Sequence, residues 1–258
     1  MAPNTWKSLK IKSDETHALR IGHRSIWIHK IENGWKIAGK IDETHVHPAR
    51  LEENPEIPED ITWSTLYSGK SNQIQLAPQL PGKPVLLKPK QDLVIYPKQS
   101  IRIFITLPVS VQLKPPGKTE VFREYPTHEL SHTWFGDTIS GEAAFSCDSP
   151  ILESPDELDV TNDRALCPIK IRNTADVPLE FIQLIINTTH LNLYWNGSSL
   201  ITDMVMVEYK GQEQISKVTY SRDKSIDADH PVLSAARESH KRSIFRKSFS
   251  LIRSIYQT

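Results

Sequence analysis

Prolines divide a series of short apolar segments between residues 84 and 113, and this pattern limits the fold more than any other feature of the chain. The dividing residues are Pro84, Pro89, Pro97 and Pro108. In the longest segment, 101–107, isoleucine or leucine occupies every second position, while Arg102 and Thr106 fall on the other side. A period of two is the repeat of a half-buried β-strand, and a helix does not repeat in this way. The segment series is therefore predicted to be a set of short strands.

Similar patterns occur on both sides of this region. Residues 26–37 predict a β-hairpin that turns at Asn33-Gly34, because this dipeptide favours tight two-residue turns. After residue 163, apolar runs alternate with turn residues, at 169–171, 179–186, 191–195 and 200–209. The chain has 18 prolines but only 10 glycines, a balance that suits many short strands with fixed ends. Several strands at short spacing are typical of β-sandwiches and barrels.

The predicted fold is mainly β, with two antiparallel β-sandwich-like units and a C-terminal amphipathic helix. The predicted divisions are an N-terminal β domain at 1–147, an acidic linker or loop at 148–163, a C-terminal β unit at 164–221 and a basic helical tail at 222–258. The boundary is placed at 148–163 because this stretch is polar, acidic and interrupted by Pro150 and Pro155.

The tail differs from the rest of the chain because residues 232–256 contain neither proline nor glycine. Apolar residues there recur at steps of three and four, which predicts an amphipathic helix with a basic opposite face. The residues expected to contact a partner are Lys241, Arg242, Phe245, Arg246, Lys247, Phe249, Ile252 and Arg253. Such a helix can dock on a protein partner, a second subunit or an anionic membrane surface, or pack on its own sheet.

Charge and composition indicate a cytoplasmic protein that does not bind nucleic acid. Thirty-one basic and 31 acidic residues cancel, so the body of the protein has no broad field that attracts polyanions. The N-terminus lacks the pattern of a secretory signal, and no apolar stretch approaches the ~20 residues that cross a bilayer. Membrane contact is expected only at the surface, through the tail. Cys147 and Cys167 are expected to be free thiols, with a disulfide between them as the alternative.

Three segments together resemble a family of uncharacterised bacterial and archaeal proteins known only as a domain of unknown function. They are the run from Pro84 to Leu113, the stretch Trp134-Phe135-Gly136, and the strand Ile169-Lys170-Ile171-Arg172-Asn173-Thr174. The resemblance extends roughly from Leu19 to Tyr220 and omits the tail. It implies a β fold and a prokaryotic source, and it implies no activity, because the family has none assigned.

Residues 128–136 read His-Glu-Leu-Ser-His-Thr-Trp-Phe-Gly and are similar to the zinc-binding line of the gluzincin aminopeptidases. That resemblance implies zinc ligands at His128 and His132 and a general base at Glu129. The aminopeptidases take their third ligand from a glutamate further along the chain, and Ile151 stands at that position here. The preceding G-x-M-E-N line of these enzymes is also missing from the sequence.

The backbone decides whether this motif can hold zinc. On a helix, Cβ atoms four residues apart are ~5–6 Å apart, so one ion fits between two imidazoles. On a strand, the same four steps span about 13 Å, which is too far for one ion. Thr133, Trp134 and Phe135 favour a strand, so the motif is interpreted as fortuitous, with no catalytic residue and no cofactor. The predicted function is a non-catalytic cytoplasmic binding or adaptor module. The alternative is a zinc-dependent hydrolase that uses His128, Glu129 and His132.

Overall fold

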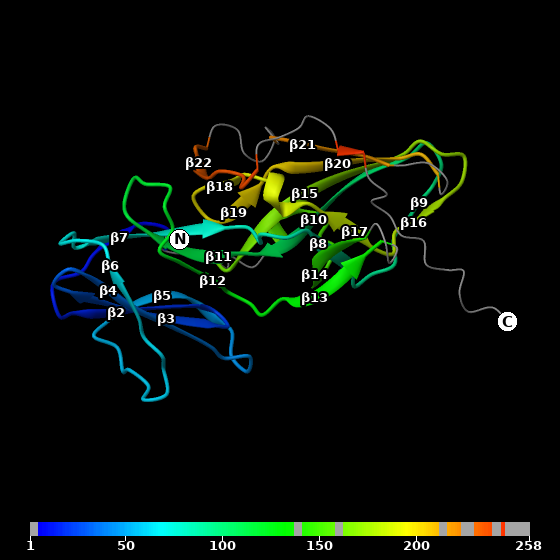
Figure 1. Cartoon of the computed structure of the whole chain (residues 1–258). Helices are drawn as coiled ribbons and strands as arrows, with labels where there is room; N and C mark the ends of the chain where they lie inside the picture. Colours follow the sequence, from blue (N-terminus) through cyan, green and yellow to red (C-terminus); the bar gives the residue numbers. More distant parts are fainter. Residues whose placement is uncertain are drawn as a thin grey trace.

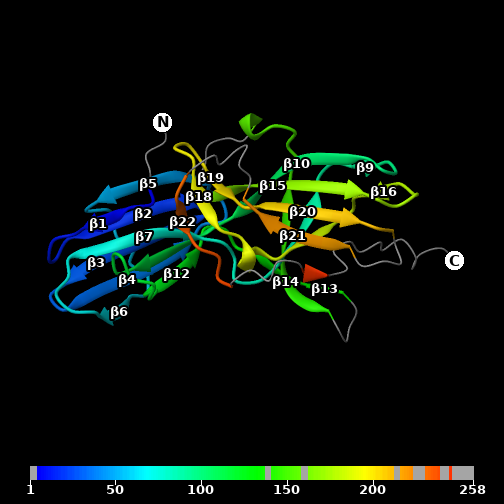
Figure 2. The same ribbon diagram turned by 90° about the horizontal axis from the view of Figure 1, so that it is seen from above.

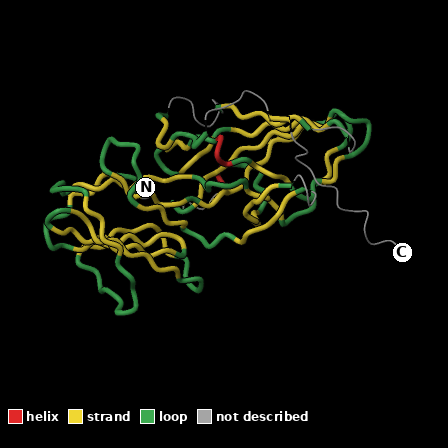
Figure 3. Tube along the Cα trace, viewed as in Figure 1, coloured by secondary structure: helices red, strands yellow, loops and turns green. Residues whose placement is uncertain are grey.

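The computed structural model describes residues 5–136, 141–157, 162–211, 216–222, 230–238 and 244–245. These residues form β-strands, loops and two short 3-10 turns, so the prediction of a mainly β protein is confirmed (Figure 3). The strands lie in two halves placed side by side along an elongated molecule (Figures 1 and 2). No helix in the described part of the chain is long and apolar enough to span a bilayer.

The first half consists of two sheets. A five-stranded sheet has the order β5-β2-β3-β4-β6, and a four-stranded sheet has the order β1-β7-β11-β12. The strands of this half are β1 (Ser8–Lys10), β2 (Thr16–Gly22), β3 (Arg24–Ile31), β4 (Gly34–Ile41), β5 (His47–Glu53), β6 (Ser64–Tyr67), β7 (Gln73–Gln79), β11 (Ser110–Lys114) and β12 (Arg123–Pro126). Every pair of neighbouring strands in this half is antiparallel.

The second half contains the remaining strands. An eight-stranded sheet has the order β22-β18-β19-β15-β20-β21-β23, and its eighth strand, β10, pairs with β15. A four-stranded sheet has the order β13-β14-β8-β17. β9 and β16 form a two-stranded sheet. The elements are β8 (Val85–Pro89), β9 (Val94–Ile95), β10 (Ser100–Pro108), β13 (Ser131–Phe135), β14 (Glu142–Ser149), η1 (Pro155–Glu157), β15 (Arg164–Asn173), β16 (Leu179–Glu180), β17 (Leu184–Ile186), η2 (Thr188–His190), β18 (Leu193–Trp195), β19 (Leu200–Thr202), β20 (Met204–Tyr209), β21 (Lys217–Ser221), β22 (Val232–Ser234) and β23 (Ile244–Phe245).

Alternating apolar residues bury β10 in the second half, where it pairs with β15. Ile103, Ile105 and Leu107 are buried in the main core, as the period of two predicts. The opposite face is also covered, because Phe104 packs with Leu166 in a second, smaller cluster. β10 is therefore buried on both faces at its centre, where the sequence predicted a half-buried strand.

Three strand pairs correct the prediction of purely antiparallel units. β14 pairs with β8 in parallel, and β15 pairs in parallel with both β19 and β20. A parallel pair needs a long crossover connection, and the 50-odd residues between β8 and β14 supply one. The apolar period of a strand reports which face is buried but says nothing of the direction of its neighbour, so the sequence could not show this.

The two halves share one core, and the acidic stretch 148–163 does not divide them. β10 precedes that stretch and β15 follows it, yet the two strands pair over nine residues. Within the stretch, Leu152 forms a bridge with Phe104 of β10. One apolar cluster runs from Trp6 in the first half to Val218 in the second. The spatial division therefore differs from the predicted boundary, because strands from both sides of the stretch build the second half.

The described parts of the tail do not support the predicted helix. Val232–Ser234 is strand β22 on β18, and Ile244–Phe245 is strand β23 on β21. A sheet edge offers unpaired backbone groups, and these short segments extend such edges. Of the expected partner contacts, only Phe245 belongs to a described element; the other seven, Lys241, Arg242, Arg246, Lys247, Phe249, Ile252 and Arg253, lie outside the described residues.

The predicted hairpin is confirmed, although its two-residue turn is Glu32-Asn33 and not Asn33-Gly34, and a buried lysine supports this turn. β3 and β4 pair from Arg24↔Ile41 to Ile31↔Gly34. The Lys30 side chain is only 2% exposed. Its Nζ donates to the carbonyl oxygens of Ile31 (2.5 Å) and Gly34 (3.1 Å) and lies 5.1 Å from the Trp35 ring centroid. The ammonium group therefore makes charge-assisted hydrogen bonds to backbone carbonyl oxygens on both sides of the turn, which offset the cost of burying its charge.

We expect Lys30→Met to lower the free energy of unfolding by about 2 kcal/mol, because the apolar replacement removes the hydrogen bonds that the charged donor makes to these carbonyl oxygens. Lys36→Met is the matched control, since Lys36 is exposed on the next strand, and it should change stability by less than about 0.5 kcal/mol. Urea unfolding of the two variants measures the difference. Equal effects would show that the turn does not depend on the ammonium group.

Candidate functional site

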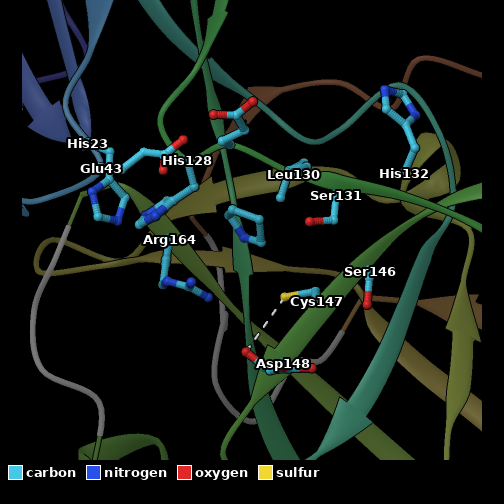
Figure 4. Close-up of a pocket in the computed structure, with 12 residues that line it drawn as sticks. His23, Glu43, His128, Leu130, Ser131, His132, Ser146, Cys147, Asp148 and Arg164 are labelled. Carbon is cyan, nitrogen blue, oxygen red and sulfur yellow. Dashed lines mark hydrogen bonds between the residues drawn. The ribbon is translucent and has the colours of Figure 1, made fainter.

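A cleft of about 670 Å³ opens where the two halves meet, and we call it the junction cleft. The residues around it come from segments far apart in the sequence (Figure 4). His23 lies between β2 and β3, Glu43 follows β4, His128 follows β12, Cys147 belongs to β14, and Arg164 begins β15. Ligand sites are common at such junctions, because a cavity forms where two packed units do not fill the space between them.

A buried histidine and aspartate connect the segments around the cleft. His128 Nε2 donates to Asp163 Oδ2 at 2.6 Å, and the two side chains are 11% and 5% exposed. Next to this pair, the Thr127 hydroxyl lies 2.6 Å from the carbonyl oxygen of Val109, and the Thr127 carbonyl accepts from the backbone N–H of His23 at 2.8 Å. The backbone N–H of Val109 donates to the Asp163 carbonyl at 3.0 Å. Four chain segments are thus held together at one point.

The hydrogen-bond partners assign one nitrogen of each imidazole. His23 Nδ1 lies 3.0 Å from the backbone oxygen of Asp42 and must carry the proton, because a carbonyl oxygen only accepts. His128 donates through Nε2 to Asp163. The two rings contact each other edge to face, with centroids 4.9 Å apart and an interplanar angle of 82°. In the neutral rings, His23 Nε2 and His128 Nδ1 therefore remain as acceptors.

Two glutamates meet beside His23. A hydrogen bond between the carboxyl groups of Glu43 and Glu129 raises the pKa of Glu43, and the nearby His23 acts in the opposite direction. Both glutamates are exposed. Burial lowers the pKa of Arg24, and the negative charge of Glu129 counteracts that effect. Two carboxyl groups therefore line the cleft on this side, and one guanidinium group lies near Glu129, outside the lining.

A guanidinium group lies deeper in the cleft. Arg164 is half-buried at the start of β15, and its Nη1 donates to Thr106 Oγ1 at 3.2 Å. The Thr106 backbone N–H in turn donates to Ser149 Oγ at 3.1 Å. Arg164 also lies next to Cys147, and burial raises the pKa of that thiol while the guanidinium lowers it. Among the described residues, no carboxylate lies within ion-pair distance of Arg164.

The H-E-x-x-H segment contributes to the cleft, but the structure does not bring its two histidines together as the zinc-hydrolase alternative requires. Residues 128–130 belong to no strand or helix, and β13 begins at Ser131, so only the end of the motif is the predicted strand. His132 is exposed on β13 and packs against Phe145, with ring centroids 5.1 Å apart. Figure 4 shows its ring on the opposite side of the cleft from His23 and His128.

The His128 and His132 rings lie on opposite sides of the cleft, so they do not converge on one point as the two zinc ligands of this motif would. Glu129 interacts with the carboxyl group of Glu43. Within the described ranges, no group of three or more histidine, cysteine, aspartate or glutamate side chains is arranged to hold a metal ion.

Sequence reasoning identified His128, Glu129 and His132 but missed the residues that surround them. His23, Asp163 and Arg164 stand in a turn, at the end of the acidic stretch and at the start of a strand. One signal was available for Asp163, because the stretch 148–163 was already recognised as acidic. No local pattern marks His23 or Arg164, since their proximity to His128 arises only from the strand pairing.

Both cysteines are free and buried, in agreement with the predicted free thiols. Burial raises the pKa of Cys167 to about 12 and also raises that of Cys147. A raised pKa keeps a thiol protonated and unreactive at neutral pH, and reactivity returns only as the pH approaches the higher value.

We therefore expect a chromogenic disulfide reagent at about pH 8 to modify Cys167 of the folded protein at least ~1000-fold more slowly than in the unfolded chain, where a cysteine has its ordinary pKa. Guanidinium chloride without a reductant should release both thiols at once. Rapid modification of both thiols in the folded protein would contradict the burial, and a chain that shows no thiol after unfolding would instead contain a disulfide.

Comparison with known proteins identifies one family. No curated protein and no solved structure matches the chain. The family model described as "Protein of unknown function (DUF432)" matches residues 5–253, which includes strands of both halves and most of the tail. This match is longer than the region from Leu19 to Tyr220 over which the sequence resembles a family of unknown function. The chain therefore belongs to the DUF432 family of proteins of unknown function.

Proposed function

We propose that this protein is a binding or adaptor module without a catalytic step of its own, and that its ligand site is the junction cleft. The observation that carries the proposal is the cleft itself, a hollow of about 670 Å³ lined by His23, His128 and Arg164 at the contact between the two halves. Pockets of ~300–1000 Å³ with a few fixed polar groups are typical of small-molecule sites. The His128–Asp163 hydrogen bond and the Arg164–Thr106 hydrogen bond favour binding, because both hold polar groups in place before a ligand arrives.

The zinc-dependent hydrolase remains the weaker alternative, because His128 and His132 do not converge on a common point. Metal analysis of protein purified without chelators separates the two proposals. We expect substoichiometric zinc that does not change in His132→Ala. Stoichiometric zinc that is lost in His132→Ala would reverse the preference.

Closing the cleft tests the binding proposal directly. Ser146 lies on β14 in the cleft wall and is only partly exposed, so Ser146→Phe should fill part of the hollow. A library of small polar metabolites is screened by thermal unfolding of the unmodified protein and the variant. A ligand at a hundredfold excess over its Kd stabilises a protein by about 2.7 kcal/mol, or roughly 5–10 °C for a chain of this size. Ser146→Phe should remove most of that shift.

The control is Ser100→Phe, at the exposed start of β10 and outside the cleft wall. It should leave the ligand-induced shift intact. If every stabilising ligand acts equally on Ser146→Phe and Ser100→Phe, the cleft is not the binding site and the proposal is wrong.

The cytoplasmic location and the docking role of the tail stay predictions. Free buried cysteines are compatible with a reducing compartment. Most of the expected contact residues of the tail lie outside the described part of the chain.

A further inference from the structure

We infer that the ligand of the junction cleft is a small molecule with an acidic group at one end and a protonated amine at the other. This inference rests on the proposed function and specifies the chemical class of its ligand. It follows from how cationic and anionic side chains are distributed over the depth of the cleft.

The acidic end is assigned to Arg164. A guanidinium group has five N–H donors in a planar fork that matches a carboxylate or a phosphate. Thr106 Oγ1 accepts from one nitrogen of Arg164, and the Cys147 sulfur lies beside the group. No carboxylate of the described chain pairs with it, although the half-buried position would make such a pair favourable. The remaining donors can therefore bind the oxygens of a ligand.

Thr106 fixes the orientation of this guanidinium group. Thr106 is 5% exposed, and its backbone N–H donates a hydrogen bond to the hydroxyl of Ser149, which is fully buried. An arginine held in this way loses little side-chain entropy when it binds an oxyanion. The arrangement is that of a prepared anion subsite and differs from a flexible surface arginine.

The amine end is assigned to the pair Glu43 and Glu129. Both carboxyl groups are exposed, whereas Arg164 is half-buried, so the acids lie nearer the mouth of the cleft. Glu43 and Glu129 line the same cleft, and their carboxyl groups interact with each other. Two neighbouring carboxylates repel each other unless a proton or a cation lies between them. A ligand ammonium group would replace that proton. His23 Nε2, which is an acceptor in the neutral ring, lies on the same side.

A ligand of a single charge fits these walls less well. The ionisable groups that line the cleft are Glu43, Glu129, Asp148, Arg164, His23, His128 and His132. Three carboxyl groups and one guanidinium group would repel a simple anion, and a simple cation would leave Arg164 without a counter-charge. Arg24, near Glu129, reduces the negative charge at the mouth but does not cancel both carboxyl groups.

The test uses ω-amino acids of increasing length, namely glycine, 4-aminobutyrate and 6-aminohexanoate, as probes. For each one, the corresponding N-acetyl derivative removes the positive charge, and the corresponding amide removes the negative charge. Binding is measured by isothermal titration calorimetry with the full chain. We expect at least one amino acid to bind at least tenfold more tightly than its N-acetyl derivative and its amide.

Side-chain replacements should reproduce these losses one by one. Arg164→Gln should weaken binding of the amino acid about tenfold and abolish its advantage over the amide. The double variant Glu43→Gln with Glu129→Gln should abolish its advantage over the N-acetyl derivative. Arg123→Gln, an exposed arginine on β12 outside the cleft wall, is the control and should bind like the unmodified protein. If Arg164→Gln does not fold, Arg164→Lys replaces it and should bind with intermediate affinity, because it keeps the charge and loses the fork.

The outcomes separate this inference from the proposed function. Library ligands that depend on an open cleft, together with no binding of any ω-amino acid, would overturn the inference and leave the binding proposal standing. Binding of an amino acid that Arg164→Gln does not weaken would also overturn the inference. If Ser146→Phe weakens the binding of no library ligand and of no amino acid, the proposed function itself is wrong.

Discussion

Gly34→Ala should lower the free energy of unfolding by about 3–4 kcal/mol, which is a large effect for the addition of one methyl group. A Cβ atom at this position would lie 1.9 Å from the backbone oxygen of Leu66, 2.9 Å from its carbonyl carbon and 3.0 Å from the Cα atom of Tyr67. All three are backbone atoms, so no change of side-chain rotamer can make room. The alanine must therefore displace β6 from the edge of the five-stranded sheet.

Two measurements test this expectation. Urea unfolding gives the loss of stability, and hydrogen exchange should show faster exchange in β6 than in the β3–β4 hairpin. Gly82→Ala is the matched control, because the nearest atoms to a Cβ there belong to the Arg237 side chain at 3.9 Å. It should stay within about 0.5 kcal/mol of the unmodified protein. If the two alanine variants are equally stable, the close approach of β6 to Gly34 is wrong.

Gly34 also shows how far the sequence could predict the fold. Asn33-Gly34 predicts the correct hairpin, but the two-residue turn of the structure is Glu32-Asn33, one residue earlier. Gly34 is the first residue of β4. It does not have the positive φ that a glycine in a tight two-residue turn would have. Among the described residues, such a φ occurs at six glycines, Gly69 and Gly117 among them, and at Asp14, Asn54 and Lys98. A glycine is needed at position 34 because β6 passes close by, and that strand lies 30 residues further along the chain.

The same limit applies to the larger architecture. The period of two correctly predicted strand segments such as β10 and β15, since it depends only on neighbouring residues. Which strands pair is decided by packing between distant segments, so the β10–β15 pair and the parallel β8–β14 pair could not be predicted. The described parts of the tail, which are strands where a helix was expected, differ from the prediction for a related reason. The apolar spacing of the tail suits a helix, but sheet edges compete for the same segments, and β23 pairs with β21.

Only part of the candidate site could be predicted from the sequence, for the same reason. The H-E-x-x-H motif identifies a segment that lines a cleft, although its two histidines lie on opposite sides of that cleft. His23 and Asp163 lie 105 and 35 residues from His128, yet both contact it directly. A motif reports only neighbours within a few residues, and the chemistry of this cleft depends on groups that strand pairing brings together.

Asp163→Ala should destabilise the protein by about 3 kcal/mol, because it leaves His128 Nε2–H buried without an acceptor. The carboxylate oxygen accepts from that nitrogen at 2.6 Å, and both side chains are almost completely buried. The pair lies where Gly22, Thr127 and Val109 meet, and a Cβ at Gly22 would approach the Asp163 side chain to 3.2 Å, so there is little room for rearrangement. Asp148→Ala is the control. Asp148 is exposed in the same cleft, and its loss should change stability by less than about 0.5 kcal/mol.

A double-mutant cycle shows whether the loss comes from the hydrogen bond or from the removal of either side chain alone. His128→Ala also breaks the pair, so the variant that carries both alanines should be less destabilised than the sum of the single variants by at least about 1.5 kcal/mol. Urea unfolding of the four proteins gives this coupling energy. Additive effects within about 0.5 kcal/mol would mean that His128 and Asp163 act independently. The junction between the two halves would then depend on the backbone contacts of Thr127 and Val109, and the cleft would have to keep its shape without the histidine–aspartate pair.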